Sequence, residues 1–253
     1  MLKAYCQMFG LIINVNELTK TATLSKFDTV RANNSIYDWS DKLDLSEEVE
    51  ITFADEAYAK INRFTYTEES GEDKPTGTDG TIEINNEGLN DEETLIELPF
   101  AATGVDEMLK KITLNNIGLL EDGKLRNSKE LRVLRLNRVD AADLSDTSSL
   151  TYKDGTSTTV VSTDIPLTYF SGATGLGFGE KLLADNYVAL SEVMARYKKV
   201  TALFRLNEAD INQLDFTRPV YVNYFNAYFY IAKISEYAPG ENESTKVELV
   251  KLF

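Results

Sequence analysis

The sequence predicts a β-rich α+β protein built from small mixed sheets or barrel-like β domains. Three observations support this fold class. Short segments in which apolar and polar residues alternate recur along most of the chain, as expected for half-buried strands. Helical spacing of apolar residues is largely confined to a short segment at the start and one longer segment near residues 180–199. Turn-forming pairs such as Asp154-Gly155 and Pro239-Gly240 separate predicted strands.

The first 30 residues predict a helix followed by a β-hairpin. Residues 2–9 have an amphipathic pattern that stops at Gly10, and glycine commonly follows the last residue of a helix. Strands are expected over residues 11–15 and 21–27, because a polar, turn-forming stretch lies between them. We therefore treat residues 1–30 as a helix–hairpin unit.

Residues 31–175 predict a β-rich domain. One or two helical turns are expected between residues 54 and 61, and the acidic, glycine-containing stretch 68–80 predicts a loop. The expected strands are residues 49–53, 63–67, 81–84, 94–98, 110–114 and 131–139, with a hairpin over 151–161.

Residues 176–253 predict an α+β C-terminal domain. Apolar residues between 180 and 199 recur at a spacing that suits one helix of about five turns. Asn207 is placed to cap a short helix, because its side chain can accept hydrogen bonds from free first-turn amides. The expected strands are residues 200–206, 220–225, 228–234 and 246–252.

The composition excludes several kinds of enzyme. The chain has 253 residues, no histidine and one cysteine, so it cannot contain a Ser-His-Asp triad, a histidine zinc site or an internal disulfide. Cys6 lies among apolar residues and is interpreted as a small buried hydrophobe. Carboxylate, lysine and tyrosine chemistry remain open, but we expect no enzyme activity, no cofactor and no metal site.

The net charge of −15 argues against nucleic-acid binding, which needs concentrated lysine and arginine. The most basic stretch, residues 124–138, alternates its charges with apolar residues and is interpreted as an element with a solvated basic face. No apolar run near the start is long enough to span a bilayer, so no membrane insertion is expected.

Two motifs that could indicate catalysis fail on their spacing or setting. Gly172, Gly175, Gly177 and Gly179 lack the Gly-Lys-Ser/Thr ending of a phosphate loop and are interpreted as a flexible link. Acidic clusters occur in polar stretches, such as residues 68–73 and 91–93, where carboxylates are solvated rather than held across a cleft.

Aromatic residues are dense between residues 221 and 230. On strands of period two, these side chains cannot all face one core. We therefore expect some of them at a subunit interface or in core packing, and a glycan-binding platform is the alternative. The candidate interface residues are Tyr221, Tyr224, Phe225, Tyr228 and Tyr230.

The C-terminal half contains Thr201-Ala202-Leu203-Phe204-Arg205-Leu206, Pro219-Val220-Tyr221-Val222, Tyr228-Phe229-Tyr230-Ile231 and Lys246-Val247-Glu248-Leu249-Val250. These segments resemble the last part of tail proteins carried by prophages of gut anaerobes. Residues 2–11 with the following hairpin resemble the helix–hairpin unit of phage baseplate-hub, or tail-tip, proteins. Asp38-Trp39-Ser40 and residues 62–66 also fit these tail proteins.

The resemblance implies a structural component of a phage or prophage tail that acts by self-assembly, usually as a homotrimeric ring. The expected partners are other copies and other tail proteins, and the expected location is the virion tail, assembled in the host bacterial cytoplasm. Hub proteins normally carry a further N-terminal barrel, so the abrupt start suggests that this chain is the C-terminal part of a longer protein. A carbohydrate-binding or adhesive module that uses the aromatic strands is the main alternative, and a carboxylate-only glycoside hydrolase is a third.

Overall fold

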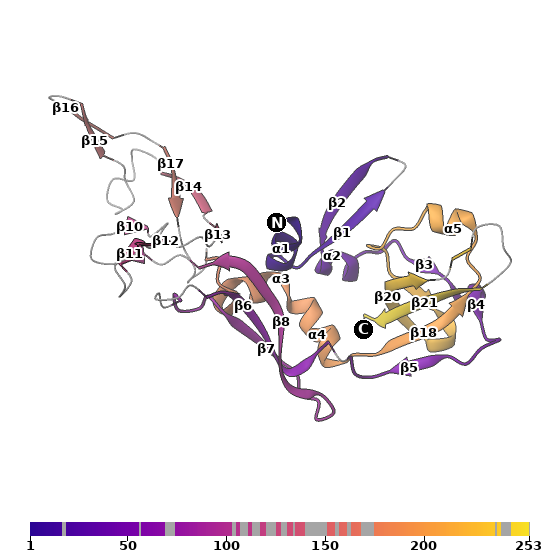
Figure 1. Cartoon of the computed structure of the whole chain (residues 1–253). Coiled ribbons are helices and arrows are strands. Elements are labelled where there is room, and N and C mark those ends of the chain that lie inside the picture. The colour runs from indigo at the N-terminus through magenta and orange to yellow at the C-terminus, as the bar shows by residue number, and fades with distance from the viewer. Residues whose placement is uncertain are drawn as a thin grey trace. The chain divides into compact units, whose positions relative to one another are not determined.

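The computed structural model comprises two compact units of the chain (Figure 1). Unit 1 comprises Met1–Phe64, Thr81–Ile96 and Leu182–Phe253, and unit 2 comprises Thr65–Gly80 and Glu97–Lys181. The described residues are 1–16, 19–55, 57–68, 74–102, 105–106, 111–112, 117–119, 125–127, 131–133, 135–139, 151–154, 157–160, 163–167, 175–235, 237–238 and 244–252.

Unit 1 contains a seven-stranded sheet that curls into a half-barrel. The strand order is β3-β19-β20-β21-β18-β4, and β5 also pairs with β18. The pairs are antiparallel except β3 with β19, and β20 has an irregular register between Ile231 and Lys233. The strands are β3 (Tyr37–Asp38), β4 (Leu43–Asp44), β5 (Glu50–Thr52), β18 (Lys199–Phe204), β19 (Val220–Val222), β20 (Ala227–Ser235) and β21 (Thr245–Lys251).

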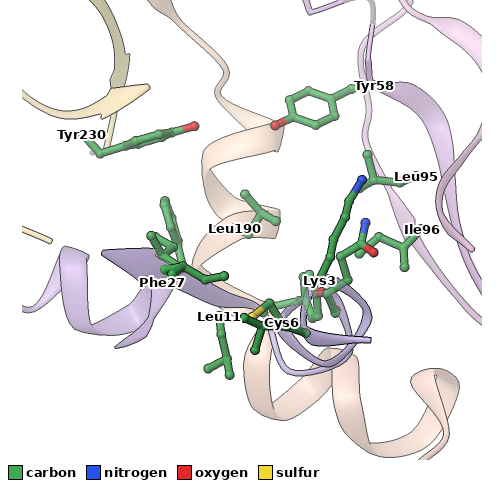
Figure 2. A pocket seen from close by; sticks show the side chains of 15 residues that line it. Lys3, Cys6, Leu11, Phe27, Tyr58, Leu95, Ile96, Leu190 and Tyr230 are labelled. Carbon is green, nitrogen blue, oxygen red and sulfur yellow. The ribbon is translucent and has the colours of Figure 1, made fainter. Parts of the chain in front are cut away.

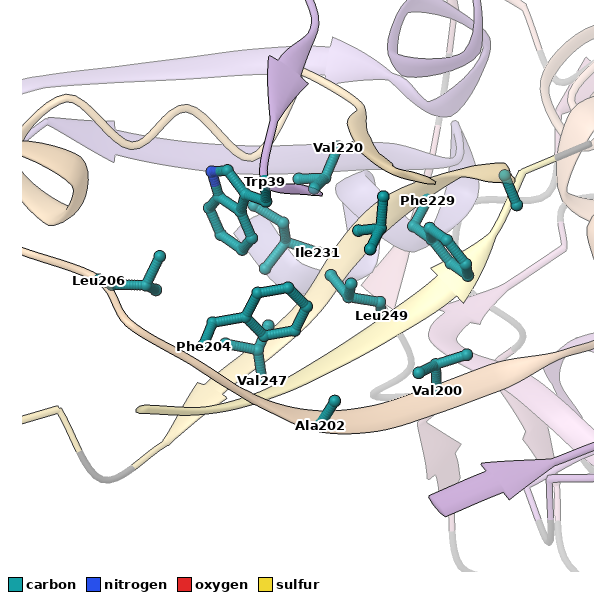
Figure 3. Close-up of a cluster of buried hydrophobic side chains, with 12 residues drawn as sticks. Trp39, Val200, Ala202, Phe204, Leu206, Val220, Phe229, Ile231, Val247 and Leu249 are labelled. Atoms are coloured by element: carbon teal, nitrogen blue, oxygen red, sulfur yellow. The ribbon is translucent and has the colours of Figure 1, made fainter. Parts of the chain in front are cut away.

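One face of this sheet carries the main core of unit 1. Alternate residues of each strand point to the same face, so β18 buries Val200, Ala202 and Phe204 and leaves the residues between them half-buried. Figure 3 shows Trp39 beside Phe204, and their ring centroids are 5.4 Å apart. The remaining members of this cluster are Leu206, Val220, Val222, Ala227, Phe229, Ile231, Val247 and Leu249.

A second apolar cluster involves two helices, α2 (Phe27–Arg31) and α4 (Val188–Ala195). Val250 lies next to Leu249 on β21, so it points to the opposite face from the main core. The buried members of this cluster are Phe27, Val30, Ala189, Val193, Tyr197, Val250 and Leu252. The sheet is therefore buried on both faces near the C-terminal end of β21.

The predicted helix–hairpin unit is confirmed. Helix α1 (Leu2–Met8) is followed by Gly10, whose φ of +57° lies in the left-handed region that glycine adopts readily. Strands β1 (Leu11–Asn16) and β2 (Thr21–Lys26) then form an antiparallel two-stranded sheet.

A second sheet has the order β13-β8-β6-β7, and both β6 and β8 begin in unit 1 and end in unit 2. Its strands are β6 (Ala59–Thr67), β7 (Gly80–Glu83), β8 (Asn90–Ala101) and β13 (Leu131–Arg132). Further two-stranded pairs are β9 (Val105–Asp106) with β10 (Lys111–Ile112), β11 (Ile117–Leu119) with β12 (Leu125–Asn127), β14 (Arg135–Val139) with β17 (Thr163–Leu167), and β15 (Thr151–Asp154) with β16 (Ser157–Val160).

The prediction of one longer helix near residues 180–199 is wrong. A π-helical turn, η2 (Phe178–Leu182), leads into α3 (Leu183–Asn186), and α4 follows a break at Tyr187. The break has a tertiary cause, because the buried Tyr187 packs its ring against Phe64 and donates its hydroxyl to the carbonyl of Gln7. After α4 the chain enters β18, so the helical region ends before residue 199.

Three smaller expectations also need correction. The segment 54–61 contains no helix among its described residues, because β6 already begins at Ala59. The strand expected over residues 220–225 ends at Val222, and a 3₁₀ turn, η3 (Asn223–Phe225), leads to Asn226 in the left-handed region. Residues 171–174 of the expected flexible link lie outside the described part of the chain, whereas Phe178 is fully buried in η2.

The remaining short helices are η1 (Ser40–Lys42) and α5 (Glu208–Asn212), and α5 has the predicted Asn207 cap.

The boundaries predicted at residues 30 and 175 stay predictions. Unit 1 combines residues from all three predicted domains, since the sheet pairs strands from residues 37–52 with strands from residues 199–251.

Candidate functional site

The five predicted interface aromatics do not form one surface. Tyr221 of β19 lies directly opposite Tyr228 of β20, and their ring centroids are 5.0 Å apart. Both rings are half-buried on the face of the sheet away from the main core. The Tyr221 hydroxyl lies 3.4 Å from Asn223 Oδ1 and 3.3 Å from Asn226 Oδ1.

The other three aromatics lie in different settings. Tyr224 is 63% exposed and contacts Phe225 edge to face, and Phe225 in turn packs on the buried Phe229. Tyr230 belongs to the second apolar cluster, where its ring meets Phe27 at a centroid distance of 5.3 Å. Tyr230 thus contributes to packing between the sheet and α2.

The hairpin β1–β2 has one apolar face that is open to solvent. Ile13 pairs with Leu24, and Val15 pairs with Ala22, so these four side chains lie on the same face. Val15 is 60% exposed and Leu24 is 48% exposed. The sequence shows the alternation of Ile13, Asn14 and Val15, but alternation does not reveal which face the rest of the protein covers.

The opposite face of the hairpin contacts the rest of unit 1 through β1, whereas Thr21 and Thr23 of β2 on that face are exposed. Asn14 Nδ2 donates a 2.8 Å hydrogen bond to Asp215 Oδ1, in the loop after α5, and Ile12 packs against the second apolar cluster. The arrangement is inverted relative to an ordinary surface hairpin, which turns its apolar face inward. An isolated two-stranded hairpin is only marginally stable in water, so an uncovered apolar face at this place suggests a contact with another molecule.

A pocket of about 720 Å³ lies at the base of the hairpin, within unit 1. Figure 2 shows Leu11 and Cys6 on one side of it, Leu190 behind, and the hydroxyls of Tyr58 and Tyr230 directed toward each other. Lys3 is its cationic group. Cys6 is buried, as predicted. The pocket continues the apolar surface of the hairpin, because Ile13 contributes to both.

A carboxylate lies beside the tyrosines near this pocket. Tyr197 Oη donates a 2.5 Å hydrogen bond to Asp55 Oδ2, and the rings of Tyr197 and Tyr58 pack edge to face. Burial, aided by the charge of Asp55, raises the pKa values of Tyr58, Tyr197 and Tyr230. Burial also opposes ionisation of Asp55, but hydrogen bonds from Tyr197 and the Ala57 amide, with the charge of Lys199, leave its pKa lowered. Asp55 is therefore an ionised hydrogen-bond acceptor beside these tyrosines.

The edge of the half-barrel at β5 is a further exposed apolar surface. Ile51 pairs with the fully buried Val200, so it continues the face that carries the main core, yet its side chain is exposed. Leu45 and Phe53 are also exposed, and Phe53 is 63% accessible. The charged residues between Leu45 and Phe53 are Glu47, Glu48 and Glu50, all of them exposed.

Chemical groups typical of a metal centre are not gathered in the described part of the chain. Within it, no cluster of three or more aspartate, glutamate or cysteine side chains could hold a metal ion. The same residues contain no helix with the length and apolar character needed to cross a membrane.

Comparisons with protein-family models and with curated proteins find no match to this chain.

Proposed function

We propose that the protein is a structural subunit of a phage or prophage-derived tail, of the baseplate-hub or tail-tip type, that acts by self-assembly. The observation that carries this proposal is the inverted hairpin. Its polar face is bonded to the protein through Asn14 and Asp215, while Ile13, Val15 and Leu24 face solvent. An apolar surface of this kind lowers its free energy when a second protein surface covers it.

The composition supports a role in assembly rather than in turnover. The chain has no histidine, and its one cysteine is buried, so the side chains that most often transfer protons or attack substrates are absent or enclosed. In the proposed role, the chain functions through contacts with other copies and with other tail proteins in the virion.

Sedimentation velocity over a wide range of protein concentration tests this proposal. We expect a concentration-dependent oligomer, consistent with a ring of three copies, and electron micrographs in which the particles are closed rings. Tail-tube, tape-measure and fibre genes beside this gene would support the tail assignment. A strict monomer at high concentration, with Val15 and Leu24 still accessible to solvent, would contradict the proposal.

Carbohydrate binding remains the second candidate function, and one observation favours it. The half-buried rings of Tyr221 and Tyr228 lie next to the amide side chains of Asn223 and Asn226, which combines a stacking surface with hydrogen-bonding groups. Glycan binding that is lost in Tyr228→Ala but kept in Phe225→Leu would favour this candidate. A glycan array without binding would count against it.

A further inference from the structure

We infer that the apolar hairpin face of one copy docks on the open β5 edge of a second copy. The hairpin face consists of Ile13, Val15, Ala22 and Leu24, and the β5 edge consists of Leu45, Ile51 and Phe53 with Glu47, Glu48 and Glu50. This inference rests on the proposed self-assembly and adds the two surfaces through which it occurs.

The hairpin has the charge that this partner requires. Residues 2–26 contain three lysines, Lys3, Lys20 and Lys26, against the single carboxylate of Glu17. The chain as a whole has a net charge of −15, so this segment is a basic region in a strongly acidic protein. Association with an identical copy is opposed by general charge repulsion unless the contact places these lysines beside carboxylates.

The β5 edge provides those carboxylates next to an apolar strip. Its segment from Leu45 to Phe53 contains three glutamates and no lysine or arginine. Two cations lie nearby. Lys198 Nζ is 6.0 Å from the centre of the Phe53 ring, and Lys199 lies opposite Thr52 of β5, where it is paired with Glu248 at 3.8 Å. The local charge therefore remains acidic, opposite in sign to that of the hairpin segment.

The edge is also incomplete as part of a sheet. Strand β5 pairs with β18 on one side, and among the described residues no strand pairs with its other side. Ile51 lies on the core face of the half-barrel but is exposed, although Val200, directly opposite it on β18, is fully buried. A strand or apolar face from outside would extend the sheet and complete the core there.

The two surfaces lie at separate places on unit 1, as Figure 1 shows for the hairpin and β5. Contact between two different patches on identical chains is heterologous, so each copy can bind one neighbour through its hairpin and another through its β5 edge. Such contacts produce a closed ring or an open filament rather than an isolated dimer.

Two double variants test this geometry, each designed to disable one surface. Val15→Glu with Leu24→Glu places two carboxylates on the hairpin face, and Ile51→Lys with Phe53→Lys places two cations on the β5 edge. The matched controls have the same charge changes at other exposed sites of unit 1: Asn85→Glu with Asn90→Glu, and Glu83→Lys. Circular dichroism establishes that each variant keeps the native fold.

We expect both surface variants to be monomeric at concentrations where the unchanged chain and both controls are assembled. An equimolar mixture of the two surface variants is expected to form dimers and nothing larger, because it retains one intact hairpin and one intact edge per pair. Sedimentation velocity distinguishes these species.

Three results would overturn the inference while leaving the proposed self-assembly intact. The first is a β5 variant that still assembles, which would mean that the hairpin pairs with itself or with another surface. The second is a hairpin variant that still assembles. The third is a mixture of the two variants that remains monomeric. A monomeric unchanged chain would instead reject the proposed function together with this inference.

A cross-linking measurement checks the contact without disrupting it. In a background of Cys6→Ala, one chain has Val15→Cys and the other has Phe53→Cys. A short bis-maleimide is expected to join the two kinds of chain at least about 10-fold more efficiently than it joins either kind to itself. Equal yields for all pairs would contradict the head-to-tail contact.

Discussion

Tyr197 and Asp55 are joined by a 2.5 Å hydrogen bond from the tyrosine hydroxyl to the carboxylate, which connects the chain after α4 to the segment before β6. Asp55 also accepts a hydrogen bond from the Ala57 amide. The contact therefore fixes the position of Tyr58, whose ring packs on Tyr197 and borders the pocket.

We expect Tyr197→Phe to lower the free energy of unfolding by about 1 kcal/mol at pH 7, because Asp55 loses a donor but keeps contact with water. The pKa of Asp55 should rise toward its ordinary value in this variant. Urea unfolding measures the first effect, and an NMR titration of the carboxyl carbon measures the second. An unchanged pKa of Asp55 would show that the hydroxyl does not stabilise the carboxylate.

Stability should also fall in alkali because of the same cluster. The pKa values of Tyr58, Tyr197 and Tyr230 are raised in the folded protein, so the folded state holds these protons more tightly than the unfolded state. Their contribution is complete below the unfolded pKa of about 10 and is lost as the pH rises above it. Urea unfolding from pH 9 to 11.5 should show this decline, and Tyr230→Phe should make it less steep. A tyrosine absorbance titration in which all residues ionise near pH 10 without unfolding would contradict this prediction.

Asp44 should contribute to stability in the opposite pH range. Its carboxylate accepts hydrogen bonds from Ser244 Oγ at 2.5 Å, the Ser46 amide at 3.0 Å and Arg205 Nε at 3.1 Å. These bonds, that from Ser244 above all, hold the pKa of Asp44 well below its usual range. The stability that they provide is present above the unfolded pKa of about 4 and is lost as the pH falls below it.

We therefore expect Asp44→Asn to lower the urea midpoint at pH 7 and to have a progressively smaller effect below pH 4. Asp38→Asn is a suitable comparison, because the carboxylate of Asp38 accepts hydrogen bonds from the amide and hydroxyl of Ser40 within its own turn. A midpoint difference for Asp44→Asn that stays constant from pH 7 to pH 3 would contradict the assignment.

Gly10→Ala should destabilise the junction between α1 and β1. Its φ is +57°, and a Cβ atom there would lie 2.7 Å from the carbonyl oxygen of Asn186. The left-handed conformation alone costs roughly 1–2 kcal/mol for a residue with a side chain, and the contact with backbone adds to it. Gly77→Ala is the comparison, since Gly77 also has a positive φ, of +78°. Thermal unfolding should show a larger loss for Gly10→Ala.

Phe204→Ala should be the most damaging of these changes. Phe204 is fully buried against Trp39, and removal of a buried phenylalanine costs about 3–5 kcal/mol. Trp39 is the single tryptophan of the chain, so its fluorescence reports on this core directly. We expect a red-shifted emission and a lower urea midpoint, whereas Leu203→Ala on the other face of β18 should cost much less. An unshifted emission in Phe204→Ala would contradict the described packing.

Local patterns were sufficient to predict much of the secondary structure. The stop at Gly10 and the cap at Asn207 are both present, because each depends on the backbone geometry of a few neighbouring residues. The aromatic strand after Asn226 is also present, and the alternation of Ala227, Phe229 and Ile231 on its buried face follows the strand period.

Other features depended on residues distant in sequence. The helix expected near residues 180–199 is divided because Tyr187 packs on Phe64 and bonds the carbonyl of Gln7, neither of which is visible in the local pattern. In the same way, the half-buried Tyr230 packs against the cluster between the sheet and α2, while Tyr224 is exposed, although both belong to one aromatic run. The sequence placed all five aromatics together as candidates and could not separate them.

The hairpin shows which features depend on the local sequence and which depend on the tertiary fold. Alternation in residues 11–26 is enough to establish two strands with one apolar and one polar face, because side chains of a strand point alternately to opposite sides. The tertiary fold decides which face contacts the rest of unit 1. Asp215 accepts a hydrogen bond from Asn14, which lies on the polar face. The uncovered apolar face, and with it the proposed contact between copies, is thus a consequence of packing across some 200 residues of sequence.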